Sequence, residues 1–134
     1  MTGESVLIIE DDGIIALHLQ ETLKKAGYTV EDPVVSENEA LDRFARLPLP
    51  DIVLVDAGEP ALSPHTDKAR RFCSDDNIPA VILTSFEGAR GARRAEGGRL
   101  ETFLTKPFSE RELLTAVGTA LRSRVIRPEP EFLK

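Results

Sequence analysis

The chain is poor in the residues that mark secreted, membrane and nucleic-acid-binding proteins. Of its 134 residues, one is cysteine, one is tyrosine and none is tryptophan. A lone cysteine forms no internal disulfide, no signal peptide precedes Val6, and no apolar run approaches the ~20 residues that span a bilayer. Scarce aromatic residues argue against a surface that stacks nucleic-acid bases. We therefore expect a cytoplasmic protein with no membrane partner and no direct nucleic-acid partner.

Charge and length narrow the class further. The chain has 23 acidic and 17 basic residues, a formal net charge of -6, which disfavours anionic partners. Its length suits one domain with a core that needs no disulfide or metal. We expect this domain over residues 1–122. Residues 123–134, which include Pro128 and Pro130, are expected to form a helix end and a short flexible tail.

Four short apolar runs each end on polar residues that bind a cation or a phosphoryl group. Such runs, separated by stretches with helical periodicity, are typical of buried strands in a parallel sheet. Ligands of these sheets bind at the carboxyl ends of the strands, so the polar residues are expected to converge there. The runs are Val6 to Ile9 before Glu10-Asp11-Asp12, Ile52 to Val55 before Asp56, Val81 to Leu83 before Thr84-Ser85, and Phe103 to Thr105 before Lys106-Pro107.

The segments between these runs predict helices. Residues 13–26 have an approximately helical apolar face, and Gly27 follows where a glycine commonly ends a helix. Two capping boxes, Ser36 with Glu39 and Ser109 with Glu112, predict further helix starts. The apolar face of the first helix contains Ile14, Leu17, Leu19, Leu23 and Ala26, and that of the last contains Leu113, Leu114, Val117 and Leu121.

The remaining segments complete an alternation of strand and helix. Residues 28–35 predict a second strand, and residues 66–73 a third helix with few apolar positions. Residues 87–99 contain four arginines and no large apolar residue. Such a run could bind an acidic partner, but a solvated helix is the more frequent explanation. Five strand–helix units predict an α/β fold of three layers, with a doubly wound, five-stranded parallel sheet.

Four motifs in this order resemble the receiver domain of two-component response regulators. They are VLIIEDD, IVLVDAGEP, ILTS and FLTKPF, and the resemblance covers roughly Ser5 to Arg122. It implies the flavodoxin-like, CheY-like strand order 2-1-3-4-5. The chain departs from the family pattern at residues 60–65 and at Gly97-Gly98-Arg99, around the expected third and fourth helices.

The resemblance also implies a role for each residue at the strand ends. Asp56 would accept the phosphoryl group, with Lys106 paired to it and Thr84 bonded to the phosphoryl oxygens. Mg²⁺ would be bound by Asp11 and Asp56, by the main-chain carbonyl of Gly58, and through water by Glu10. Thr84 and the aromatic Phe103 would move inward together as the switch, and receivers commonly hold the Lys-Pro bond in the cis form.

Each of these residues also has a simpler interpretation. Asp11 or Asp12 could cap the first helix, and Thr84 could be an ordinary strand-end hydroxyl. Lys106 could be a solvated lysine, and Phe103 a plain core residue. His18 and His65 have no spaced partner for metal binding, and Cys73 is best explained as a small buried apolar residue.

The resemblance implies a receiver that takes a phosphoryl group onto Asp56 from a histidine kinase or a histidine phosphotransfer protein. It would then change the surface of its fourth helix, fifth strand and fifth helix, for an unknown downstream protein or a second copy. It would catalyse only its own phosphorylation and dephosphorylation and is not classed as an enzyme. The alternative is a pseudo-receiver that binds or dimerises without phosphorylation. A haloacid-dehalogenase-type phosphatase is disfavoured, because Gly58 stands where its second acid is required.

Overall fold

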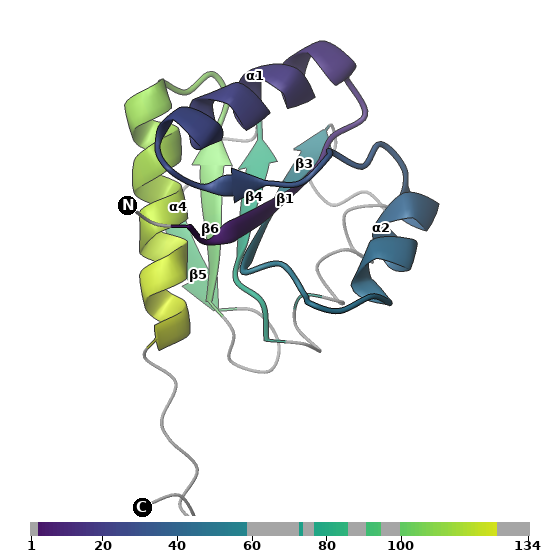
Figure 1. Cartoon of the computed structure of the whole chain (residues 1–134). Coiled ribbons are helices and arrows are strands. Elements are labelled where there is room, and N and C mark those ends of the chain that lie inside the picture. The colour runs from purple at the N-terminus through teal and green to yellow at the C-terminus, as the bar shows by residue number, and fades with distance from the viewer. Residues whose placement is uncertain (1–2, 59–72, 74–76, 86–90, 95–99, 126–134) are drawn as a thin grey trace, which may run out of the picture.

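The fold is an α/β arrangement around one twisted sheet, seen in a computed structural model of the whole chain (Figure 1). The structure describes residues 3–58, 73, 77–85, 91–94 and 100–125. Its strands are β1 Ser5–Ile9, β2 Thr29–Val30, β3 Ile52–Gly58, β4 Ala80–Thr84, β5 Gly91–Arg94 and β6 Leu100–Thr105. Its helices are α1 Gly13–Lys25, α2 Glu37–Phe44 and α4 Glu110–Val125.

The sheet order is β2-β1-β3-β4-β6-β5. The first five strands in this order are mutually parallel, which confirms the expected 2-1-3-4-5 arrangement once β6 is counted as the fifth parallel strand. β5 adds an antiparallel strand at the β6 edge. Such an edge strand on an otherwise parallel sheet is common in doubly wound folds.

Side chains of the central strands alternate between two apolar clusters, one on each face of the sheet. On one face α1 and α4 pack over β1, β3 and β4, and on the other face α2 packs with Cys73 and Ile78. Strands buried on both faces explain the near-continuous apolar runs in the sequence. Cys73 is buried in the second cluster, as expected of a small apolar residue.

The start and end of α1 follow the sequence, but its apolar face is only partly buried. The Asp12 side chain accepts hydrogen bonds from the Ile14 and Ile15 N–H groups and caps the helix. Gly27 follows the helix with a φ of 101°, a conformation that glycine adopts without strain. Leu19 and Leu23 are buried as expected, yet Ile14 is 83% and Leu17 55% exposed. Ala16 in the first turn is also buried, whereas Ile14 and Leu17 lie on another side of the helix from Leu19 and Leu23. The five apolar residues named for this helix therefore do not form one face.

Both predicted helix starts are confirmed, but only one of the two capping boxes is complete, because the Glu39 carboxylate accepts from the Val35 N–H and not from that of Ser36. The Ser36 hydroxyl accepts from the Glu39 N–H, and the Ser109 hydroxyl from the Glu112 N–H. The Glu112 carboxylate in turn accepts from the Ser109 N–H, which completes that box. α4 continues to Val125, so its last residues fall in the helix end expected within residues 123–134.

The expectation for residues 87–99 needs a correction. Gly91–Arg94 form strand β5, where a solvated helix was the common explanation for the sequence. Pairing with β6 offers this polar stretch a full set of backbone partners along one edge, which outweighs weak local helical preference. The helix expected at 66–73, apart from Cys73, and the tail at 126–134 lie outside the described residues.

Candidate functional site at the carboxyl ends of the strands

The residues expected to form the site meet at one edge of the sheet. β1 and β3 pair in register from Val6 with Ile52 to Ile9 with Val55, which brings the acidic residues after β1 next to Asp56. β4 and β6 pair up to Thr84 with Thr105, so Lys106 follows directly beside Thr84. Residues about fifty positions apart in the chain therefore lie together.

An ion pair joins two sides of this edge. The Lys106 ammonium Nζ lies 2.7 Å from the Asp56 carboxylate oxygen Oδ2 and donates a hydrogen bond to it. Side-chain exposures of 31% for Lys106 and 11% for Asp56 show that water still reaches the lysine more than the aspartate. Lys106 is therefore not the solvated lysine of the simpler interpretation, and Asp56 presents a largely desolvated carboxylate at the mouth of the site.

The backbone holds Lys106 in place as well. Its N–H donates to the carbonyl of Thr84 across the β4–β6 pair at 2.7 Å. The following Lys106–Pro107 peptide bond is cis, as the resemblance implies. The side chain thus starts from a backbone that is bonded to the neighbouring strand.

Glu10 is buried at this edge of the sheet. Its side chain is 2% exposed, and its Oε2 accepts a hydrogen bond from the Asp12 N–H at 3.1 Å. Burial, together with the nearby Asp56 and Asp11 carboxylates, raises the pKa of Glu10 to about 8, although the bond from Asp12 acts in the opposite direction. Three carboxylates therefore lie close together, and Asp56 and Asp11 disfavour the ionised form of Glu10.

The described residues leave part of Glu10 unsatisfied. No hydrogen-bond donor among them reaches its buried oxygen Oε1. A buried oxygen without a donor costs free energy, and a bound cation would remove that cost. The oxygen ligands at this edge are carboxylates, and Glu10 Oε1 has no hydrogen-bond donor among the described residues. Such oxygens fit a hard divalent cation.

The cation would still depend on water for much of its coordination. In the described part of the chain, no group of three His, Cys, Asp or Glu side chains is assembled that could hold a metal by itself. Mg²⁺ commonly keeps several waters and needs only one or two carboxylates, so it suits such a site better than a cation that demands a full protein cage.

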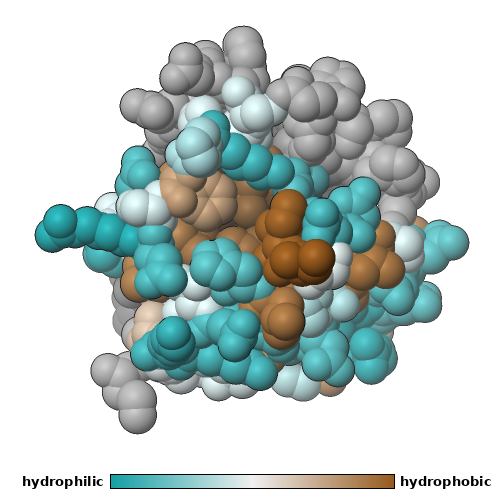
Figure 2. All heavy atoms as spheres, turned by 90° about the horizontal axis from the view of Figure 1, so that it is seen from above, coloured by the Kyte–Doolittle hydropathy of each residue, from teal (hydrophilic) through white to brown (hydrophobic). Residues whose placement is uncertain are grey.

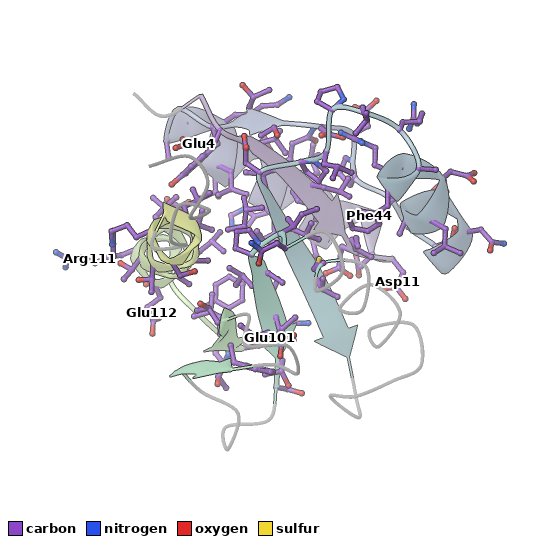
Figure 3. All side chains as sticks on the ribbon, turned by 90° about the horizontal axis from the view of Figure 1, so that it is seen from below. Glu4, Asp11, Phe44, Glu101, Arg111 and Glu112 are labelled. Carbon is purple, nitrogen blue, oxygen red and sulfur yellow. The ribbon has the colours of Figure 1, made fainter. Side chains whose placement is uncertain are left out.

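Of the two aspartates that could cap α1, Asp12 does so and Asp11 does not. Asp12 caps α1, whereas Asp11 does not take the cap and is exposed beside Glu10. The cap therefore leaves the Asp11 carboxylate available for a ligand. Figure 3 labels Asp11 on the far side of the central strands from Glu101.

The remaining expected site residues lie on strands that border this edge. Thr84 ends β4 and is fully buried. Gly58 ends β3, where the pairing with β4 shifts register between Asp56 and Gly58, so the strand is irregular directly after Asp56. Phe103 is 8% exposed within the apolar cluster of the α2 face. The observed position of Phe103 is thus the buried one.

Sequence reasoning missed two polar residues of β6. Thr105 lies directly beside Thr84, and its buried hydroxyl has no hydrogen-bond partner among the described residues. Glu101 is 2% exposed at the other end of the strand. Side chains two residues apart point to the same face of a strand, so residues 101, 103 and 105 share one face. An apolar Phe103 on that face is the sequence signal that Glu101 and Thr105 are buried too.

The comparisons agree with this fold. The family model for the response regulator receiver domain matches residues 6–118. The chain belongs to this family of receiver domains. The solved receiver protein from Sinorhizobium medicae superposes with a TM-score of 0.72 at 25% identity, over 91% of this chain and 97% of that one. The response regulator PhyR from Brucella abortus gives a TM-score of 0.71 at 26% identity, over 90% and 49%.

Curated relatives are regulators of greater length. The transcriptional regulatory protein PdtaR of Mycobacterium tuberculosis is 33% identical over 116 residues, 87% of this chain and 56% of that protein. The virulence transcriptional regulatory protein PhoP of Salmonella typhimurium is 30% identical over 117 residues, 87% and 51% respectively. The chain thus spans about half the length of these relatives, and what their remaining parts do belongs to them.

No helix within the described ranges is both long and apolar enough to cross a membrane.

Proposed function

We propose that the chain accepts a phosphoryl group on Asp56 from a phosphohistidine of a histidine kinase or a histidine phosphotransfer protein. An Asp56 oxygen would attack the phosphorus atom, and the bond from phosphorus to the histidine nitrogen would break. The products are an aspartyl phosphate and a free histidine on the donor, so no other reactant is required. The cytoplasm is the expected place for this exchange.

One observation carries the proposal: the largely desolvated Asp56 carboxylate is paired with Lys106 at 2.7 Å and borders the Glu10 and Asp11 carboxylates. Phosphoryl transfer requires a placed nucleophile and positive charge where the phosphoryl oxygens will lie. Lys106 supplies one such charge. The Lys106 side chain can turn from the Asp56 carboxylate to the phosphoryl oxygens, because these would be attached to Asp56 itself and its Nζ already lies beside that residue.

A bound Mg²⁺ would neutralise the charge that otherwise repels an anionic donor. Asp11 and Asp56 would hold it directly, Glu10 through water, and the Gly58 main chain would complete the protein share. Glu10 must be deprotonated for this role, so its raised pKa predicts weaker metal binding as the pH falls below about 8. Thr84, fully buried at the end of β4, would donate its hydroxyl to the phosphoryl oxygens.

The rim of the site suits a protein donor. Ile14 and Leu17 of α1 expose apolar side chains, and α1 begins two residues after Asp11. Figure 2 shows apolar surface gathered in the middle of the face seen from above, where α1 lies. A donor histidine must come within bonding distance of Asp56, so its protein must cover this rim. Contacts with a second copy or a downstream protein through β6 and α4 stay a prediction.

The test is the intact mass after incubation with acetyl phosphate and Mg²⁺. We expect a gain of one phosphoryl group that is lost in Asp56→Asn and when EDTA replaces Mg²⁺. The control is Asp42→Asn, an exposed acid of α2 away from the site, which we expect to be phosphorylated like the unchanged chain. An adduct that persists in Asp56→Asn would place the acceptor elsewhere. Absence of both adduct and Mg²⁺ binding would favour the pseudo-receiver.

A further inference from the structure

A hydroxyl is buried beside the site with nothing described that it bonds to. Thr105, the last residue of β6, is 7% exposed, and its Oγ1 makes no hydrogen bond among the described residues. A hydroxyl buried in this way costs free energy, which an apolar side chain of the same shape would not. A bond that Thr105 forms only when the site is phosphorylated would offset that cost.

Thr105 stands next to Thr84, the residue expected to contact the phosphoryl group. The two are Cα partners in the parallel pairing of β4 with β6, so their side chains point to the same face of the sheet, that of Ile82 and Phe103. The Lys106 N–H donates to the Thr84 carbonyl at 2.7 Å, so the strands stay bonded up to this point. Paired strands lie about 4.8 Å apart, a spacing at which neighbouring threonine hydroxyls bond after rotation to a suitable staggered conformer.

The order of the strands gives the two hydroxyls different roles. β4 lies between β3, which carries Asp56, and β6. A phosphoryl group on Asp56 would therefore be one strand from Thr84 and two strands from Thr105. Thr84 can donate its single hydroxyl proton to that group while its oxygen accepts a second hydrogen bond. Thr105 is placed to donate that second bond.

We propose that Thr105 is a positioning residue: its hydroxyl donates to the Thr84 hydroxyl, which in turn donates to the phosphoryl oxygens on Asp56. The inference rests on the proposed function, in which Thr84 contacts those oxygens. The bond from Thr105 fixes the direction of the Thr84 proton, and hydrogen bonds in a chain strengthen one another. Because phosphoryl transfer gains from donors that are already oriented, Thr105 speeds the reaction without touching the phosphoryl group.

The test is the rate at which the full chain gains a phosphoryl group from acetyl phosphate with Mg²⁺, followed by intact mass. Thr105→Val replaces the hydroxyl by a methyl group, and we expect the rate to fall about two- to tenfold, the effect of one ordinary hydrogen bond. Thr105→Ser keeps the hydroxyl and is expected to retain most of the rate. Thr102→Val is the matched control, because it removes another buried β6 hydroxyl without a described partner, whose neighbour on β4 is Val81. Its rate is expected to be unchanged.

A double substitution separates action through Thr84 from a general effect on β6. If Thr105 acts through the Thr84 hydroxyl, Thr105→Val slows the reaction no further when Thr84→Val is already present. Equal slowing with and without Thr84→Val, or equal slowing in Thr102→Val, would overturn the inference. If Thr84→Val gains no phosphoryl group at all, Thr105→Val and Thr105→Ser decide the question, and equal rates in these two variants refute the role of the hydroxyl.

Stability without a phosphoryl donor gives an independent readout. In urea unfolding without acetyl phosphate, we expect the midpoint of Thr105→Val not to fall below that of the unchanged chain, because no described residue bonds the hydroxyl that is lost. A clearly lower midpoint would show a structural bond and contradict the inference. Equal phosphorylation rates for Thr105→Val and the unchanged chain would overturn the inference and leave the proposed function standing. An unchanged chain that gains no phosphoryl group would overturn both.

Discussion

The two strands that supply the ion pair differ in what they bury. β3 leads to Asp56 through Ile52, Val53, Leu54 and Val55, all at most 1% exposed and all apolar. β6 leads to Lys106 through Glu101, Thr102 and Thr105, three buried polar residues, with Phe103 and the half-buried Leu104 among them. Two of the β6 hydroxyls, on Thr102 and Thr105, have no partner in the described part of the chain.

This difference separates a fixed side of the site from an adjustable one. A strand packed with apolar side chains on both faces has one dense arrangement, and displacing it opens cavities. A strand with unsatisfied hydroxyls loses less when it moves, because movement can bring them new partners. Asp56 therefore stands on the rigid strand, whereas Lys106 and Phe103 belong to the strand that can shift.

The largest effect on stability is expected from two matched truncations in the apolar core, one on β3 and one on β6. We expect Leu54→Ala on β3 to lower the free energy of unfolding by about 2–5 kcal/mol, the range for fully buried leucines. Leu104→Ala on β6 removes the same atoms from a half-buried site in the same cluster, so its loss is expected to be clearly smaller. Urea unfolding of both variants measures the difference, and equal losses would contradict a rigid β3.

A smaller effect on stability is expected from a change of pH that titrates Glu10, the buried acid beside Asp56. The pKa of Glu10 is about 8 in the folded chain against 4.5 as the unperturbed value. Between these values the folded chain holds the proton more tightly than the unfolded chain. The Glu10 contribution to stability is thus fully present below about pH 4.5 and is lost as the pH rises through about 8.

Urea unfolding in EDTA across that pH window measures this contribution. We expect Glu10→Gln to show a flatter pH dependence than the unchanged chain, with the variant gaining relative stability toward pH 8. Glu21→Gln, an exposed acid of α1, is expected to keep the original slope. Added Mg²⁺ is expected to flatten the slope of the unchanged chain, because a cation favours the ionised carboxylate. Parallel curves for Glu10→Gln and the unchanged chain would refute the assignment.

The smallest expected effect concerns the unsatisfied hydroxyls of β6. Thr102→Val replaces a buried hydroxyl that lacks a partner by a methyl group of similar size, so we expect no loss of stability and a gain of up to about 1 kcal/mol. Ser5→Ala is the contrast, because the Ser5 hydroxyl accepts from the Asp51 N–H just before β3. That variant is expected to lose about 0.5–1.5 kcal/mol. A marked loss in Thr102→Val would show that its hydroxyl is already satisfied.

Much of the scaffold could be predicted because its local signals and tertiary contacts agree. The apolar runs of β1, β3 and β4 predict the central strands of the sheet, and Ser36, Ser109 and Gly27 predict where helices begin or end. The convergence of Asp56 and Lys106 followed from the general placement of ligands at strand ends. Their chemical roles stay predictions until phosphorylation is measured.

The failures have a common physical cause. Ile14 and Leu17 are apolar, but they lie on another side of α1 from Ala16, Leu19 and Leu23, and apolar character alone cannot tell which side of the helix the sheet covers. Gly91–Arg94 have no apolar pattern of either period, and only the free edge of β6 decides that they form a strand. In both places the answer depends on what lies next to the element, which no local pattern contains.

Lys106 joins three strands through two different groups. It follows directly after β6, its backbone N–H is bonded to Thr84 of β4, and its ammonium is paired with Asp56 of β3. A substitution at this position removes the ammonium but leaves the backbone bond in place. Descendants of such a chain could therefore lose phosphoryl chemistry in a single step and still inherit an intact sheet, free to evolve as binding modules.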